Sequence, residues 1–264
     1  MGRVIAIINQ KGGVGKTTTT ISLGAALAEK GMYTLLIDSD PQGALSIGLG
    51  LPAYDLEFTL HSILTDTRIP IAAVTHHVRP HLDIIPSNID LAGAELQLVG
   101  MMGREFVMRD ALANIRDKYN FVLIDCPPSL GLLTVNALVA ADEILVPLQC
   151  EFLAMRGLDA LIDVIARVQR RLNPNLKMLG IVPTMYNPRR THARQVLDKV
   201  RASYPNKLLN VEIKESVRFA EAPQQHRTIF EIDKTNEGAE AYRKLAEVII
   251  NVEQPERQSQ ATTS

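Results

Sequence analysis

The sequence is poor in cysteine and has no apolar run long enough to cross a bilayer. Its two cysteines, Cys126 and Cys150, are too few for a disulfide framework or a four-cysteine metal site, and none of its six histidines has the spacing of a metal cage. Each cysteine follows an expected buried strand, so we expect two reduced core thiols. A membrane-spanning helix needs ~20 apolar residues, and no cleavable leader precedes the first expected strand. We therefore expect a soluble, cytoplasmic protein that does not bind membranes.

The rest of the composition indicates one globular domain. Of the 264 residues, 46% are hydrophobic, which is enough to form a large core. No internal repeat or long linker interrupts the chain. After Val252 the sequence becomes polar and aperiodic, so we expect a single domain over residues 1–252 and a disordered tail over residues 253–264.

Short apolar runs alternate with helical patterns along the whole domain. The expected strands are Val4–Ile8, Thr34–Ile37, Leu82–Ile85, Phe121–Ile124, Glu143–Val146, Leu179–Val182 and Leu208–Ile213. The expected helices follow the first loop up to Gly31 and then cover 89–99, 104–117, 131–140, 153–172, 191–203 and 237–251. Nearly continuous apolar strands separated by helices predict an α/β fold, a mostly parallel central sheet with helices on both faces. The segment 51–81 gives no clear pattern.

A glycine-rich loop directly after the first strand is the most informative motif. Residues 11–18 read Lys-Gly-Gly-Val-Gly-Lys-Thr-Thr. Glycines at 12, 13 and 15 allow a tight turn whose N–H groups point inward, and the following helix directs its positive dipole end at an anion. Lys16 supplies a positive charge and Thr17 a hydroxyl for Mg²⁺. The loop therefore predicts a nucleotide triphosphate site that includes Lys11, Gly12, Gly13, Val14, Gly15, Lys16, Thr17 and Thr18.

This loop departs from the usual phosphate-loop pattern, because Gln10 stands where that pattern has its first glycine. A glycine-rich turn without a ligand is the alternative, and the flanking strand and helix disfavour it. The extra lysine, Lys11, is either a solvated loop residue or a functional one as far as spacing alone can tell.

Two further strands end in aspartate on the side where the phosphates are expected. Asp38-Ser39-Asp40-Pro41-Gln42 follows one strand and Asp125-Cys126-Pro127-Pro128 follows the other. Carboxylates at such positions orient Mg²⁺ directly or through water, so Asp40 and Asp125 are candidate metal residues, and Asp40 is also a candidate for positioning the attacking water. The alternative is that these aspartates only start turns.

Five segments of the chain resemble the ParA/Soj partitioning ATPases of the deviant Walker A superfamily. They are Lys11 to Thr18, Asp38 to Gly43, Leu91-Ala92-Gly93-Ala94-Glu95, Ile124 to Gly131, and Glu221-Ala222-Pro223. The resemblance extends from residue 2 to about residue 251. It implies a slow ATPase that uses ATP and Mg²⁺ as a homodimer with the nucleotides between the two chains. Like the short members of the family, the chain begins at the first strand, so a repressor role is not expected.

The resemblance also implies roles for individual residues. Lys11 would reach across the dimer to the partner's phosphates, and Gly12 would lie where the two chains approach. Lys11, Lys16 and Asp40 would be catalytic. Thr17 would contact Mg²⁺, Asp40 would lie at the hydrolytic water, and Asp125 would lie in the outer shell of the metal.

Positive charge is concentrated in one part of the chain. Residues 156–227 carry 14 Lys and Arg against 6 Asp and Glu, a net +8, which leaves −9 elsewhere because the whole chain carries −1. Such asymmetry indicates contact with a polyanion, although solvated helix faces are the alternative. The resemblance assigns Arg189 and Arg218 to DNA backbone, and we add Arg190 and Lys214. Since no aromatic stacking residues interleave with these charges, we expect sequence-independent, salt-sensitive DNA binding and a nucleoid-associated protein.

Taken together, these features predict an ATP-dependent switch that segregates or positions cargo and is stimulated by a ParB-like partner or cargo adaptor. Where relatives often have Pro-Arg-Asn, this chain has Ile213-Lys214-Glu215-Ser216-Val217-Arg218. The resemblance therefore does not define the base pocket or the shape of this loop. A MinD-like membrane-associated ATPase would need a basic amphipathic C-terminal helix, which this tail lacks. A nitrogenase-type iron protein would need two cluster cysteines, and Cys126 is poorly placed for that. A P-loop metabolic enzyme would need a substrate pocket that the sequence does not reveal.

Overall fold

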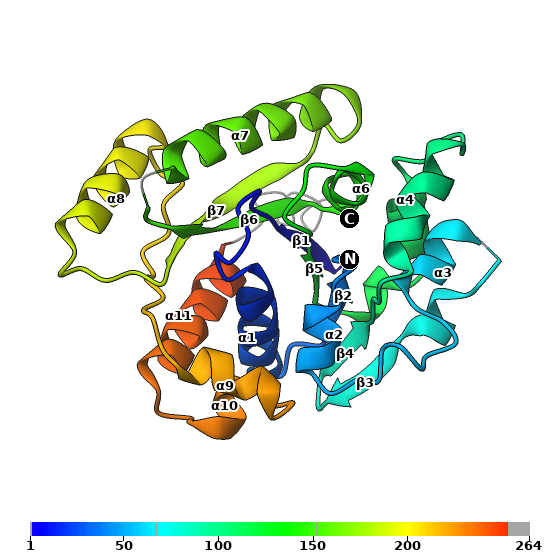
Figure 1. The fold of residues 1–264 in the computed structure, drawn as a ribbon, viewed down its shortest axis with the longest axis horizontal. Coiled ribbons are helices and arrows are strands. Elements are labelled where there is room, and N and C mark those ends of the chain that lie inside the picture. Colours follow the sequence, from blue (N-terminus) through cyan, green and yellow to red (C-terminus); the bar gives the residue numbers. More distant parts are fainter. Residues whose placement is uncertain (1, 67, 152, 253–264) are drawn as a thin grey trace, which may run out of the picture.

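A seven-stranded sheet forms the centre of the protein (Figure 1), seen in a computed structural model that describes residues 2–66, 68–151 and 153–252. Its strand order is β3-β4-β2-β5-β1-β6-β7. β3 pairs antiparallel with β4, and the other neighbouring strands are parallel. The strands are β1 Arg3–Ile7, β2 Thr34–Asp38, β3 His76–Arg79, β4 Leu82–Ile85, β5 Phe121–Asp125, β6 Glu143–Gln149 and β7 Lys177–Thr184.

Helices cover both faces of this sheet (Figure 1). The helices on one face are α3 Leu60–Thr65, α4 Leu91–Val99, α5 Val107–Ala113, α6 Leu132–Ala140, α7 Ala154–Arg171 and α8 Thr191–Ser203. Those on the other are α1 Lys16–Glu29, α2 Ala44–Gly48, α10 Ile229–Ile232 and α11 Glu237–Asn251. The remaining helical segments are α9 Arg218–Gln224 and the short 3₁₀ turns η1 Ile71–Val74 and η2 Arg116–Lys118.

Alternate residues of each central strand supply two separate cores. In β1, Val4 and Ala6 belong to the core beneath α6 and α7, whereas Ile5 and Ile7 belong to the core beneath α1 and α11. Burial on both faces explains why these strands read as continuous apolar runs. The expected fold class is confirmed. β1 lies between β5 and β6, so the strand order reverses beside the glycine-rich loop, where open α/β sheets bind their ligands.

The strand predicted over Leu208–Ile213 is wrong. This segment lies beside β7 but forms only one isolated bridge with it in the described structure, between Ile181 and Leu208. The Leu209 N–H donates to the Ile181 carbonyl at 2.9 Å, and the Ile213 N–H donates to the Pro183 carbonyl at 2.8 Å. The two donors are four residues apart, whereas the two acceptors are only two residues apart, so the residues of the segments cannot pair one to one. Pro183 has no N–H to return, so a regular ladder cannot form.

The sequence pattern also missed β3, and it predicted one helix where the structure has α5 and η2. β3 is an edge strand with half-exposed histidines and an arginine, so it lacks the apolar run that marks the buried strands. The helix predicted over 104–117 is shorter, because α5 ends at Ala113 and η2 begins at Arg116. The helices predicted over 191–203 and 237–251 have the observed bounds. The predicted tail, 253–264, lies outside the described residues.

Within the described ranges, no helix combines the length and apolar character needed to cross a membrane. Both cysteines are free and buried, as expected.

Candidate functional site

The glycine-rich loop leaves β1 and delivers the chain into α1 at the open end of the sheet. Gly13 and Gly15 have φ of 74° and 88°, a left-handed conformation that favours glycine. A Cβ added at Gly12 or Gly13 would meet nothing within 4 Å. The loop therefore offers an open concavity in which a phosphate can approach the backbone closely.

Three side-chain hydrogen bonds fix the shape of this loop. Asn9 Oδ1 accepts from the Lys11 N–H at 3.0 Å, and Asn9 Nδ2 donates to the Pro147 carbonyl at 2.8 Å. Thr184 Oγ1 donates to the Val14 carbonyl at 2.7 Å. The loop is thus attached to the ends of both β6 and β7.

Lys16 is the first residue of α1 and lies beneath the loop. Its residue is 7% exposed, and its Nζ donates to the Lys11 carbonyl at 3.2 Å. Burial lowers the pKa of Lys16, and the nearby Asp125 partly opposes that shift. A cation held this way has few competing partners and is available to a phosphate oxygen.

Asp125 ends β5 directly opposite Asp38, which ends β2. Asp125 Oδ1 accepts from Thr20 Oγ1 at 3.2 Å, whereas Asp125 Oδ2 is buried and has no hydrogen-bond partner among the described residues. Burial, followed by the charge of Asp38, raises the pKa of Asp125 to about 8. An unpartnered buried carboxylate oxygen costs free energy, so this position favours a cation or a water nearby.

Asp38 and Asp40 have different surroundings although they are two residues apart. Asp38 is fully buried and accepts from the Ser46 N–H at 2.9 Å and from Ser46 Oγ at 2.6 Å, so it secures the start of α2. Burial raises the pKa of Asp38 to about 7. Asp40 is partly exposed, and its Oδ1 accepts from the Gln42 N–H at 3.0 Å. Asp40 rather than Asp38 is therefore accessible to a ligand.

These groups fit a nucleotide with Mg²⁺. In the described ranges no three acidic, histidine or cysteine side chains form a metal cage. Mg²⁺ in nucleotide sites takes one or two protein ligands and completes its shell with phosphate and water. Thr17 would supply a hydroxyl, and Asp40 and Asp125 would act through water, while the metal would neutralise charge on the phosphates. The orphaned oxygen of Asp125 is the observation that supports this fit.

Lys11 does not extend away from its own chain. Its Nζ donates to Gln149 Oε1 at 3.2 Å and forms an ion pair with Glu151. Both partners lie at or just after the end of β6, and the Lys11 side chain is 40% exposed. The ammonium is therefore available to a second chain only after it leaves this pair.

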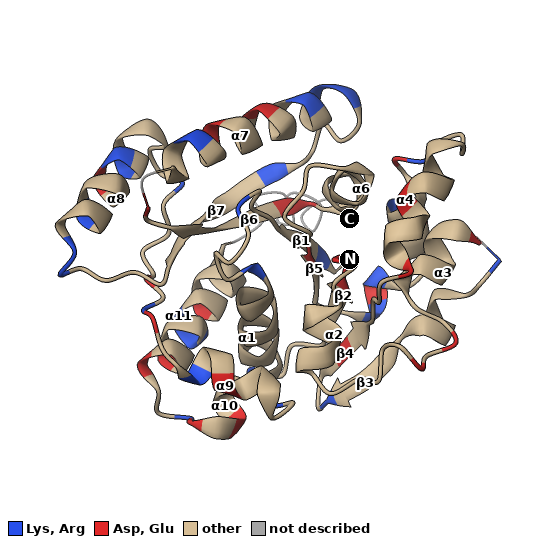
Figure 2. Cartoon of the chain, viewed as in Figure 1, with Lys and Arg blue, Asp and Glu red and all other residues tan. Residues whose placement is uncertain are grey.

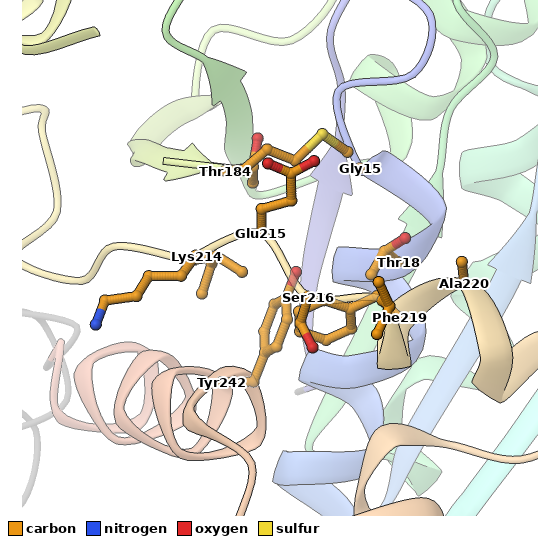
Figure 3. A pocket seen from close by; sticks show the side chains of 12 residues that line it. Gly15, Thr18, Thr184, Lys214, Glu215, Ser216, Phe219, Ala220 and Tyr242 are labelled. Carbon is orange, nitrogen blue, oxygen red and sulfur yellow. The ribbon is translucent and has the colours of Figure 1, made fainter. Parts of the chain in front are cut away.

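An apolar cavity of about 350 Å³ adjoins the loop, and part of its lining is Ile213 to Val217, the segment that the resemblance associates with the base pocket. The lining includes Thr18, Thr184, Met185, Phe219 and Tyr242 (Figure 3). The Phe219 and Tyr242 rings meet edge to face at 5.7 Å, and the Tyr242 hydroxyl lies 2.9 Å from Thr19 Oγ1. These residues come from separate segments of the chain, so no local motif could indicate them. A mostly apolar cavity beside a phosphate loop suits a nucleotide base.

The four cations expected to contact DNA fall into two pairs. Arg189 and Arg190 precede α8, are exposed, and have no ion-pair partner in the part of the chain that the structure describes. Lys214 pairs with Glu237 at 2.9 Å, and Arg218 pairs with Glu221 at 2.6 Å. Figure 3 shows the Lys214 side chain pointing away from the base cavity, and Figure 2 shows further cations along α7 and α8.

Comparisons with known proteins agree with this geometry. A family model described as an AAA domain matches residues 2–178. The sporulation initiation inhibitor protein Soj of Bacillus subtilis is 43% identical over 249 residues, which cover 94% of this chain and 98% of that protein. The chromosome partitioning protein ParA of Caulobacter vibrioides is 46% identical over 261 residues, which cover 98% of this chain and 97% of that protein.

Solved structures show the same fold. A cobyrinic acid a,c-diamide synthase from Mycobacterium smegmatis, solved with a bound ATP analogue and magnesium, is 41% identical with a TM-score of 0.84 and covers 95% of each chain. A plasmid partition protein from Borrelia burgdorferi bound to AMPPNP has a TM-score of 0.81 at 24% identity, covering 95% of this chain and 99% of that one, and supports the fold alone.

Proposed function

We propose, since this chain belongs to the ParA/Soj family of P-loop ATPases, that it is an ATP-dependent dimerising switch that binds DNA without sequence preference. In this proposal two chains enclose two nucleotides, and each Lys11 contacts the phosphates of its partner's nucleotide. The observation that carries the proposal is the additional lysine of the loop, Lys11. Lys11 lies at the open end of the sheet, and its ammonium is held by Gln149 and Glu151 at the carboxyl end of β6.

The proposed nucleotide is ATP with Mg²⁺. The loop amides, Lys16 and Thr18 would hold the phosphates, and the cavity beside Phe219 and Tyr242 would hold the base. The relatives solved with an ATP analogue and magnesium support this choice. Asp40 would orient the attacking water, because it is the accessible carboxylate of the group. Lys11 would stabilise charge on the transferred phosphoryl group, in the way a finger residue supplied in trans does.

DNA binding is proposed from the unpaired cations. Arg189 and Arg190 can contact phosphates without giving up an existing ion pair, and Lys214 and Arg218 can add to them after rearrangement. A single chain makes few such contacts and would bind weakly. A dimer presents them twice and gains through effective concentration. ATP binding would therefore control DNA binding, and hydrolysis would release the protein.

A partner that accelerates hydrolysis would clear the protein from DNA locally. The names of the Soj and ParA relatives support a role in partitioning, with a ParB-like protein or a cargo adaptor as the partner. The protein would then act on the nucleoid. The cargo can be a chromosome, a plasmid or a protein assembly.

A P-loop metabolic enzyme is the second candidate, because one similar structure is named a cobyrinic acid a,c-diamide synthase. The chemistry of this chain's two cysteines weighs against it. Amide formation from glutamine would use a reactive thiolate, whereas burial raises the pKa of Cys126 and raises the pKa of Cys150 to about 11.

Sedimentation velocity with a non-hydrolysable ATP analogue and Mg²⁺ tests the proposal. We expect a monomer without nucleotide, a dimer with the analogue, and co-migration of that dimer with DNA of any sequence. The Asp40→Ala variant should still bind ATP and dimerise but hydrolyse slowly, so it should remain on DNA. A chain that stays monomeric under saturating analogue contradicts the switch, and a dimer that ignores DNA shifts support to the metabolic candidate.

A further inference from the structure

α4 is apolar on both of its sides. Leu91, Ala94 and Leu98 are buried, and the helix packs against α3 and α6. Glu95 is the single charged residue among the nine residues of α4. A helix that is apolar all round is normally covered on every side.

The opposite side of α4 is exposed. We define the α4 stripe as Ile89, Leu96, Val99 and Met102, which are 52%, 81%, 60% and 100% exposed. Leu96 and Val99 lie three residues apart and share one side of α4, whereas Ile89 and Met102 lie in the turns just before and just after the helix. The stripe is therefore a group of four exposed apolar side chains on α4 and its two flanking turns.

The end of the α4 stripe at Ile89 is acidic, whereas at its other end Arg104 Nη1 donates to the Val99 carbonyl at 2.6 Å. Residues 51–113 carry eight Asp and Glu against four Lys and Arg. Asp90 lies at the first end of α4, and the hydrogen bond from Asn88 Nδ2 to the Ala53 carbonyl, at 3.2 Å, brings the loop with Asp55 and Glu57 to the same end. These three carboxylates are exposed and have no cationic partner in the portion of the chain that is described.

We propose that the α4 stripe is the docking surface for an amphipathic helix of a partner protein, with lysines or arginines on the part that reaches Asp90. The apolar side chains would contribute burial and the unpaired carboxylates would select a basic partner. This proposal rests on the proposed function, because it gives the activating partner its place on the molecule. An anionic membrane surface does not match the carboxylates around the stripe.

One side chain, Glu95, would link a partner docked at this surface to the loop that follows the metal-site aspartate. Glu95 lies on α4 between the buried and exposed sides and accepts from the Leu133 N–H at 3.2 Å. A Cβ added at Gly131 would lie 2.5 Å from Glu95 Oε1, so the carboxylate packs closely against the start of α6. The loop that ends at Gly131 begins directly after Asp125. A shift of α4 would therefore be transmitted to the segment that follows the metal-site aspartate.

Binding of a labelled synthetic helix by fluorescence anisotropy tests the docking surface on the full chain. The probe has about five turns, with leucine along one side and lysine elsewhere. Its controls are the same leucine stripe with glutamate in place of lysine, and the same composition with the stripe scrambled. We expect the lysine helix to bind most tightly. Leu96→Gln should weaken it at least about tenfold, whereas the matched control Tyr33→Gln, a 54% exposed residue elsewhere, should not.

Other outcomes decide against the proposal. Equal binding to wild type and Leu96→Gln overturns it, and equal binding of the glutamate helix removes the basic partner. Self-association of the nucleotide-free chain that Leu96→Gln abolishes assigns the stripe to a second copy, and Leu96-dependent sedimentation with phosphatidylglycerol vesicles assigns it to a membrane. Analogue-dependent dimerisation and DNA binding are measured on the same variant. If both persist in Leu96→Gln, the proposed function stands whatever the helix does.

Discussion

Two groups of cationic side chains, Lys16 in the loop and Arg189 with Arg190 before α8, lie in opposite kinds of surroundings. Lys16 is buried, its loop is fixed by side-chain hydrogen bonds to β6 and β7, and carboxylates lie within its electrostatic reach. Arg189 and Arg190 are exposed and have no ionic partner within the described residues. A fixed, desolvated cation recognises one ligand geometry, whereas exposed cations attract any polyanion. Substitution of Lys16 should therefore remove most of the nucleotide affinity at once. Substitution of the arginines before α8 should lower DNA affinity in steps, by an amount that depends on salt.

The sharpest test of this contrast is Lys16→Ala. Removing a buried charge that binds a phosphate costs about 2–5 kcal/mol, so ATP affinity should fall at least about 30-fold. Isothermal titration calorimetry with the non-hydrolysable analogue measures this. Lys199→Ala is the matched control, because Lys199 is an exposed lysine on α8. Unchanged ATP affinity in Lys16→Ala contradicts the assignment of the loop.

Lys11→Ala should separate nucleotide binding from dimerisation. The Lys11 ammonium bonds to Gln149 and Glu151, whereas the Lys11 bonds that shape the loop are made by its backbone, so loss of the side chain leaves the local loop intact. We expect near-normal ATP affinity for the monomer and no dimer under saturating analogue. Stimulated turnover should fall by about 10³-fold or more if Lys11 acts like an arginine finger. A dimer with normal turnover in Lys11→Ala removes the proposed role in trans.

The contrast also explains what the sequence could predict. The loop and the acidic strand ends were predictable because contiguous residues determine them, and the parallel sheet brings strand ends together at one edge. The resemblance pointed to Ile213 to Arg218 for the base cavity, but the contribution of Thr184, Phe219 and Tyr242 was not predictable, because they meet only in the folded chain. The pairing of Lys11 with Glu151 joins residues 140 positions apart and has no local signal.

The failed strand at Leu208–Ile213 teaches the same lesson at the level of the backbone. Val211 and Ile213 are buried and Leu208 and Leu209 are partly buried, as the pattern indicates, but Pro183 and the unequal spacing of the two segments prevent a ladder. Burial can be predicted from residue type. Register depends on the neighbouring strand, which the local pattern does not contain.

At the edge of α8, the double variant Arg189→Ala/Arg190→Ala should weaken DNA binding more than Lys214→Ala/Arg218→Ala. Arg189 and Arg190 have no ion-pair partner among the described residues, whereas Lys214 and Arg218 must leave Glu237 and Glu221 to reach a phosphate. Each lost phosphate contact should lower the salt slope of binding by about 1. Anisotropy with labelled DNA at several salt concentrations measures both variants. The reverse order of effects would place the main DNA contact beside α9.

The smallest expected effect concerns the ion pair that holds Lys11. For Lys11 to reach a second chain, its pair with Glu151 must break, and partly exposed pairs of this kind are worth about 0.2–1 kcal/mol. Glu151→Gln should therefore tighten analogue-dependent dimerisation by up to about fivefold for each of the two ion pairs that must break, while leaving ATP affinity of the monomer unchanged. Glu247→Gln, which removes the partner of Lys30 on a distant helix, is the matched control. Sedimentation equilibrium resolves a change of this size. Weaker dimerisation in Glu151→Gln would mean that Glu151 itself contributes to the contact between the two chains.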